Sequence, residues 1–167
     1  SLSAAAPNHQ DRWSLKRVGL AADRLPRVLG CDVAGVLDDG TEVVVHAVIS
    51  TPGWTGDETL DPKRTLLSEL HDGTLAQQVV VPARNVLPKP TTLSWEEAAC
   101  LPTAWLTAYR MLFTQSGLRP GPTVLVPGAG GGFATAATAL AKHAGLTVWA
   151  TSRAEDRRNN ALQIGAH

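Results

Sequence analysis

A glycine-rich turn at residues 128–132 constrains this chain more than any other feature, because of what lies on either side of it. Residues 123–126 are a short apolar segment, and residues 133–144 are rich in Ala and Leu. A second apolar segment follows at residues 146–150, and a polar helical segment at 154–164. Alternation of strand and helix at this spacing predicts an α/β unit, with a parallel sheet and right-handed crossovers.

The residues of the turn suit a bound phosphate. Gly128, Gly131 and Ala134 fit the pattern G-x-x-G-x-x-A, and Gly132 and Phe133 lie between the last two. Glycines allow a sharp bend and a close approach to bare backbone, and a small Ala lets the helix pack against the strand. The N-terminus of the helix adds unpaired N–H groups for a pyrophosphate. The turn therefore predicts a dinucleotide site; the alternative is a tight turn that binds nothing.

The segment after the second strand bears on which dinucleotide is bound. Sites for NAD usually have an acidic residue there, about 20 residues beyond the glycines. This chain has Ser152 and Arg153 instead, with Arg157 one helical turn further on. A hydroxyl and guanidinium groups suit a 2′-phosphate, which favours NADPH. The alternative is that Ser152 and Glu155 form a capping box and the arginines are simply solvated.

The first half of the chain has a different character. Residues 33–37 and 42–49 are β-branched runs separated by an Asp-Gly turn, which predicts a hairpin. Residues 50–73 hold many Pro and Gly residues and predict a long irregular excursion. Short strands are expected at 75–81 and 85–87. Together these segments predict a small antiparallel barrel.

Two helices are predicted between the barrel and the glycine-rich turn. Ser94 and Glu97 match a capping box that opens a helix over residues 95–100, and Pro102 interrupts it. Residues 104–116 predict a second helix that ends at Gly117.

Composition excludes several classes of protein. The 15 basic and 15 acidic residues give no net charge, which argues against nucleic acid or an anionic membrane surface as a partner. No apolar run approaches the roughly 18–20 residues that span a bilayer. The two cysteines, Cys31 and Cys100, lack a disulfide or metal-binding spacing. We therefore expect a reduced, cytoplasmic protein.

Several segments, taken in order, resemble the medium-chain dehydrogenase/reductase superfamily. The similarity covers nearly the whole chain and is closest to its quinone oxidoreductase-like branch. The matching segments are residues 8–11 (NHQD), 29–36 (LGCDVAGV), 73–76 (GTLA), 79–82 (VVVP), 97–109 (EAACLPTAWLTAY), 124–134, 150–153 (ATSR) and 164–166 (IGA).

The resemblance implies a GroES-like barrel over residues 1–93, followed by the first βαβ part of a Rossmann domain over residues 94–167. It implies that Thr107 lies near the nicotinamide of NADP(H), and that Asn8 faces both the nicotinamide and a small-molecule substrate. Asn8 is the one candidate catalytic residue, and no proton donor is assigned. The resemblance also departs from the usual pattern at Phe133 and Ala134, where Val and Gly are more common, and the Phe is expected to crowd the cofactor.

The same resemblance carries an expectation about zinc. The positions that hold the catalytic zinc of the superfamily's alcohol dehydrogenases fall on Asn8, Cys31 and Thr103. Amide and hydroxyl groups are poor zinc ligands, so no metal is expected. Without a Lewis acid, hydride transfer from NADPH to a quinone or an α,β-unsaturated carbonyl compound fits better than alcohol oxidation. The alternatives are a catalytically inactive nucleotide-binding or interaction module, and a relative of the zinc alcohol dehydrogenases.

The length of the chain raises a further expectation. A Rossmann sheet has about six strands, and only two are predicted here. We therefore expect a piece of a longer enzyme or a truncated relative, whose uncovered sheet face makes a homodimer possible.

Overall fold

The computed structural model describes residues 1–119 and 121–167. The chain divides into two compact units, Ser1–Thr103 and Ala104–His167. Each unit is described by itself.

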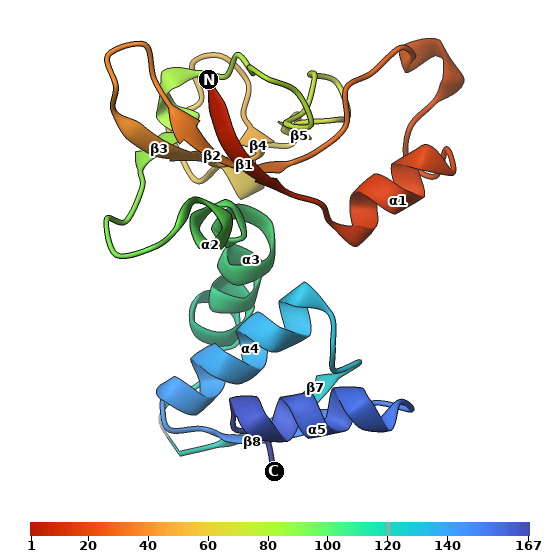
Figure 1. Ribbon diagram of the computed structural model, residues 1–167, viewed down its shortest axis with the longest axis vertical. Helices are drawn as coiled ribbons and strands as arrows, with labels where there is room; N and C mark the ends of the chain where they lie inside the picture. The colour runs from red at the N-terminus through yellow and green to blue at the C-terminus, as the bar shows by residue number, and fades with distance from the viewer. Residues whose placement is uncertain (120) are drawn as a thin grey trace. The chain divides into compact units, whose positions relative to one another are not determined.

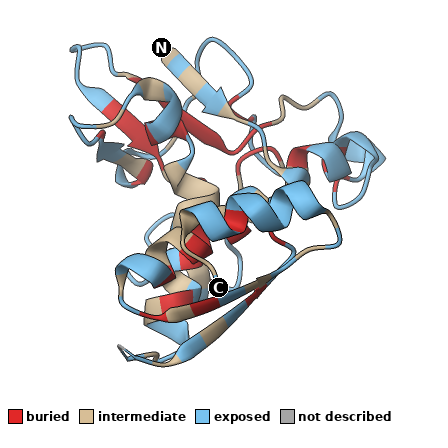
Figure 2. Cartoon of the chain, turned by 60° about the horizontal axis from the view of Figure 1, so that its bottom comes forward, coloured by how far each residue is buried: buried red, intermediate tan, exposed pale blue. Residues whose placement is uncertain are grey.

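The first unit is built on a four-stranded antiparallel sheet in the order β1-β2-β3-β6 (Figure 1). Its central strands β2 and β3 are almost entirely buried (Figure 2). The four strands are β1 (Leu2–Ala6), β2 (Asp32–Val36), β3 (Glu42–Val45) and β6 (Val86–Pro88).

The hairpin between β2 and β3 forms where the Asp-Gly turn predicts it. The backbone N–H of Leu37 donates to the Thr41 carbonyl, and Gly40 takes a φ of +87° that a glycine adopts without strain. The second β-branched run is divided, however. After β3 the chain bends and pairs β4 (Val48–Ile49) with β5 (Thr65–Leu66) as a separate two-stranded sheet.

The irregular excursion predicted at residues 50–73 is held by two buried or bridging side chains. Asp61 is buried and accepts hydrogen bonds from the backbone N–H groups of Thr51 and Lys63. Arg84 donates to the carbonyls of Trp54 and Gly56 and pairs with Glu58. Short 3-10 turns lie at Glu58–Leu60 and Ala83–Asn85.

Two parts of the first unit differ from the sequence-based prediction. Residues 75–81 form no strand, although the Gln77 carbonyl accepts a hydrogen bond from the N–H of Leu2. Residues 1–30, whose Pro, Gly and charged residues predict loop and short elements, contain β1, α1 (His9–Leu15) and a 3-10 turn at Ala22–Arg24. The edge strand β1 was missed because its alanines carry no β-propensity.

Helix α2 (Trp95–Ala99) confirms the predicted capping box. The Glu97 N–H donates to Ser94 Oγ at 3.2 Å, and the Ser94 N–H donates to Glu97 Oε2 at 2.9 Å. Its buried residues Ala98 and Ala99 pack with Ala34 and Val44 of the sheet. Because α2 packs on β1 and β2, it lies within the compact unit Ser1–Thr103. The predicted boundary between a GroES-like and a Rossmann domain after residue 93 stays a prediction.

The second unit contains the predicted β-α-β-α series. Strands β7 (Thr123–Pro127) and β8 (Thr147–Thr151) pair in parallel, with Val124 opposite Val148 and Val126 opposite Ala150. They are connected by α4 (Gly132–His143), and α5 (Glu155–Ile164) follows β8. Before β7, the predicted helix over 104–116 is a short α3 (Leu106–Tyr109) between π-helical segments at Leu101–Trp105 and Arg110–Gln115.

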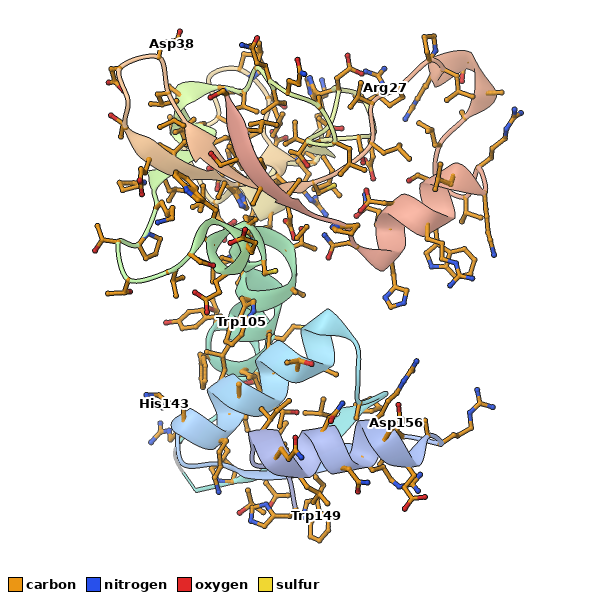
Figure 3. All side chains as sticks on the ribbon, in the orientation of Figure 1. Arg27, Asp38, Trp105, His143, Trp149 and Asp156 are labelled. Carbon is orange, nitrogen blue, oxygen red and sulfur yellow. The ribbon has the colours of Figure 1, made fainter. Side chains whose placement is uncertain are left out.

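One face of the β7–β8 pair forms the core of the second unit. Val126 and Val148 are buried with the small residues of α4, which let that helix lie close to both strands. The opposite face leaves Leu125 and Trp149 63% and 53% exposed, and Trp149 points away from α4 (Figure 3). No helix among the described residues is long and apolar enough to cross a membrane.

We predict that Gly73→Ala destabilises the first unit. A Cβ at Gly73 lies 2.3 Å from the Gly30 carbonyl oxygen and 2.5 Å from the Leu29 carbonyl carbon, so backbone has to move. Overpacking of this kind costs about 1–3 kcal/mol. Urea unfolding of the purified chain measures the loss.

Gly56→Ala is the matched control, because its Cβ meets nothing closer than 3.4 Å, the Nε1 of Trp54. Equal stability of the Gly73 and Gly56 variants would contradict the packing described here.

Candidate functional site

The turn between β7 and α4 is shaped by two left-handed glycines and one carbonyl group. Gly128 and Gly130 have φ angles of +80° and +99°. The Thr151 carbonyl at the end of β8 accepts the N–H groups of Gly128, at 3.0 Å, and Ala129, at 2.8 Å. These two amides are therefore committed to the fold and are not available to a ligand.

The amides that remain for an anion lie at the start of α4. Gly131 caps the helix, and its carbonyl accepts the first intrahelical hydrogen bond, from Thr135 at 2.9 Å. The N–H groups of Gly132, Phe133 and Ala134 precede that bond and have no intrahelical acceptor. Space is open beside the cap residue, since a Cβ at Gly131 meets nothing within 4 Å, whereas a Cβ at Gly132 would contact Ala104 Cβ at 3.5 Å.

The expectation that the Phe133 ring crowds the cofactor stays a prediction. The side chain is half-buried and packs against the core of the second unit. Ala134 is buried in the same core, which agrees with the predicted need for a small residue at this helix–strand contact.

A cavity of about 670 Å³ lies beside the turn, where β8 ends and α5 begins. It brings together four of the nine residues predicted to bind the cofactor: Gly128, Ser152, Arg153 and Arg157. Ala129, Thr151 and Ala154 complete its wall. The wall therefore includes two residues with hydroxyl groups, Thr151 and Ser152, and two with guanidinium groups, and none of these seven residues is acidic.

The capping-box alternative for Ser152 is not what the structure shows. Ala154, not Ser152, is the N-cap of α5, and Ser152 Oγ accepts a hydrogen bond from the Ala154 N–H at 3.3 Å. The Ser152 hydroxyl can still donate its proton to an anion in the cavity.

Gly130 was not among the predicted site residues, yet it decides where Arg157 lies. A Cβ at Gly130 would approach Arg157 Cδ to 2.6 Å, so the aliphatic part of Arg157 rests directly on the glycine. Arg157 also lines a second cavity of about 290 Å³ between α4 and α5, together with Ala134. The second glycine of the turn, Gly130 itself, is the only sequence signal for this contact.

Thr107 and Asn8 lie outside the cavity. Thr107 is an exposed residue of α3 in the second unit. Asn8 lies in the first unit as the N-cap of α1, and its Nδ2 donates to Asp32 Oδ2 at 2.9 Å. The roles near the nicotinamide and substrate remain predictions for both residues.

Asn8 belongs to a buried polar cluster around Asp32, which is 1% exposed. Asp32 Oδ1 accepts the hydroxyl of Thr103 at 2.6 Å, and its Oδ2 accepts the Asn8 amide. The neighbouring Asp11 accepts the N–H groups of Asn8, at 2.6 Å, and Gly30, at 3.0 Å. Burial raises the pKa of Asp32 to about 6, although the hydrogen bonds from Thr103 and Asn8 oppose the rise.

The residues at the three expected zinc positions do not fit a zinc ion. The side chains of Asn8 and Thr103 donate hydrogen bonds to Asp32, and neither an amide nor a hydroxyl group is a favoured zinc ligand. Cys31 is buried, with its Sγ 3.2 Å from the Leu67 carbonyl oxygen, and burial raises its thiol pKa to about 11. A thiol that resists deprotonation is a weak ligand. No cluster of three or more His, Cys, Asp or Glu residues that could hold a metal occurs within 1–119 and 121–167.

Comparison with known proteins identifies the superfamily. The chain is 31% identical, over 99% of its length, to a crotonyl-CoA reductase of Streptomyces avermitilis, and 33% identical over 99% to a zinc-type alcohol dehydrogenase-like protein of Schizosaccharomyces pombe. A solved NAD-dependent alcohol dehydrogenase superposes over 99% of the chain with a TM-score of 0.91 and 40% identity. The chain belongs to the medium-chain dehydrogenase/reductase superfamily.

A second solved relative carries a nucleotide. Crotonyl-CoA carboxylase/reductase AntE in complex with NADP superposes over 99% of the chain, with a TM-score of 0.86 and 27% identity. No protein-family model matches the chain. The chain spans about half of each relative: 45% and 50% of the two curated proteins, and 52% and 47% of the two solved chains.

We predict that Asp32→Asn removes one pH dependence of stability. Burial raises the pKa of Asp32 from its ordinary value of 3.8 to about 6, so the folded state holds the proton more tightly than the unfolded state does. The stabilisation from Asp32 is complete below pH 4 and is lost as the pH rises through 6. About 2 pKa units correspond to about 3 kcal/mol.

The measurement is urea unfolding of the wild-type chain and the variant from pH 4 to pH 7. The difference in unfolding free energy, wild type minus variant, should fall across this range. Asp38→Asn, at the exposed hairpin turn, is the control with the same chemical change. A difference that stays constant with pH would show that Asp32 does not titrate in this range.

Proposed function

We propose that this chain binds NADPH in the second unit and serves a zinc-independent reductase. The acceptor is a carbon–carbon double bond conjugated with a carbonyl group, in a thioester or a quinone. The observation that carries the proposal is the cavity at the end of β8, where Ser152, Arg153 and Arg157 face one space.

The preference for NADPH over NADH follows from the charge of that wall. A ribose 2′-hydroxyl is usually read by a carboxylate, whereas a 2′-phosphate needs cationic and hydroxyl donors. Arg153 and Arg157 supply the cationic donors that a 2′-phosphate needs. The same wall offers no carboxylate to the 2′-hydroxyl of NADH. The relative AntE was solved with NADP, which supports this reading, and the relative described as NAD-dependent is the reason to test it.

The remaining cofactor contacts follow from the turn. The N–H groups of Gly132, Phe133 and Ala134, which have no intrahelical acceptor, are proposed for the diphosphate, whose negative charge the helix N-terminus favours. NADPH, when bound, supplies the hydride. Thr107 is proposed for the nicotinamide side and Asn8 for the substrate side, because the superfamily resemblance places them there.

The proposed acceptor needs no metal. A conjugated carbonyl group already draws electron density from the double bond, so hydride can add at the β-carbon and a proton from water can complete the reduction. An alcohol substrate lacks this activation and depends on a Lewis acid. Asn8 and Thr103 hold Asp32 instead of a zinc ion, which disfavours the alcohol dehydrogenase alternative.

The substrate class rests on the relatives' names. Crotonyl-CoA reductases match the chain at 31% identity in Streptomyces avermitilis and 35% in Streptomyces collinus. We therefore test crotonyl-CoA as the thioester and a benzoquinone as the quinone, following the absorbance of NADPH.

Turnover of a simple alcohol with added zinc, and of neither conjugated compound, would favour the alcohol dehydrogenase alternative. Tight NADPH binding without any turnover would favour the inactive nucleotide-binding module.

We predict that Arg153→Ala weakens NADPH binding by ~10-fold and changes NADH binding by less than ~2-fold. One charge-assisted hydrogen bond to the 2′-phosphate is worth about 1.4 kcal/mol, which is tenfold in affinity. Titration followed by the fluorescence of the reduced nicotinamide measures both dissociation constants.

Arg12→Ala is the control, because Arg12 is an exposed arginine of α1 in the first unit. Equal weakening of both nucleotides by Arg153→Ala, or equal affinity of the wild-type chain for both, would remove the basis for the NADPH assignment.

A further inference from the structure

Arg158 lies beside the cavity without lining it, and its side chain is turned toward the backbone. Its Nη1 donates to the Ser152 carbonyl at 2.8 Å and to the Arg153 carbonyl at 3.0 Å. Arg153 and Arg157 line the cavity, whereas Arg158 is absent from its wall. One of three neighbouring arginines is therefore committed to the segment that carries the other cationic groups.

The two hydrogen bonds fix the connection between β8 and α5. The Ser152 and Arg153 carbonyls belong to consecutive peptide groups, so a single guanidinium nitrogen holds both at once. Ser152 Oγ adds a local bond by accepting the Ala154 N–H. The segment 152–154 is thus anchored at both carbonyls from the first turns of α5, where Asp156 is labelled in Figure 3.

An anchored backbone changes what Arg153 can do. A guanidinium group on a long side chain loses conformational freedom when it grips a phosphate, and that cost opposes binding. If the backbone beneath it is already fixed, less freedom remains to be lost. The same anchoring fixes the direction from which the Ser152 hydroxyl enters the cavity.

We propose that Arg158 is a positioning residue that sets the preference for a 2′-phosphorylated nucleotide by holding the backbone of Ser152 and Arg153. This inference rests on the proposed function, since it concerns the selectivity of that same cavity. It assigns to Arg158 a geometric role and not a share of the charge that attracts the phosphate.

The test separates geometry from charge by comparing Arg158→Met with Arg158→Lys in the full chain. Lysine keeps the positive charge. Because its side chain is shorter than that of arginine, its ammonium group is not expected to reach both carbonyls. We expect both variants to lower the ratio of NADPH to NADH affinity by ~10-fold, mainly through weaker NADPH binding. Arg119→Met removes an exposed charge of the same unit outside the cavity and should leave the ratio unchanged.

A second measurement needs no nucleotide. Amide hydrogen exchange of the ligand-free chain should be faster over residues 151–156 in both Arg158 variants than in the wild type, while exchange in α4 is unchanged. If Arg158→Lys keeps the wild-type ratio of NADPH to NADH affinity, the effect is due to charge and the proposal is overturned. Unchanged amide exchange over residues 151–156 in both variants would also overturn it. Absence of any NADPH preference in the wild-type chain would instead overturn the proposed function, and the exchange result would still report on the anchoring.

Discussion

The second unit depends on the contact between the Thr151 carbonyl and the first two amides of the glycine-rich turn. The hydrogen bonds from Gly128 and Ala129 join the end of β8 to the turn that follows β7. They bring the turn before α4, which begins at Gly132, next to the start of segment 152–157. One backbone carbonyl therefore connects the two segments that line the cavity at the end of β8.

Much of this arrangement could be predicted because local sequence and fold agree. The parallel strands, the helix after the glycines and the Ser94–Glu97 capping box each have a strong short-range signal, and the structure contains all three. The cavity also unites Gly128, Ser152, Arg153 and Arg157, as the spacing of motif residues implied. Pattern is most informative where a turn requires particular backbone angles.

Other features are settled by long-range contacts that sequence does not display. The apolar character of residues 75–81 predicts a strand, yet they form no strand pairing. Their contact with β1 is a single hydrogen bond, from the Leu2 N–H to the Gln77 carbonyl. Strand β1 and helix α1 lie in a segment whose sequence predicts only loop and short elements. Arg158 gave no sequence signal either, because its role depends on two carbonyls that its own neighbours bring within reach.

The first unit shows how one buried carboxylate can organise residues far apart in the chain. Asp32 collects Asn8 and Thr103, which are 24 and 71 residues away. Uncompensated burial of an acid is costly, and here two neutral donors offset part of that cost. The cluster explains two departures from the zinc-binding pattern: Asn8 and Thr103 are hydrogen-bond partners of a carboxylate and not ligands of a cation.

The contact between Gly130 and the aliphatic part of Arg157 makes substitutions at these two positions depend on each other. Any side chain added at Gly130 would collide with Arg157 Cδ and would also force a non-glycine residue to a φ of +99°. Substitutions at these two positions are therefore epistatic: a shorter residue at 157 relieves the collision but not the backbone strain, so its benefit depends on what already stands at 130. Whatever residue stands at 157, the left-handed φ at position 130 still favours glycine there.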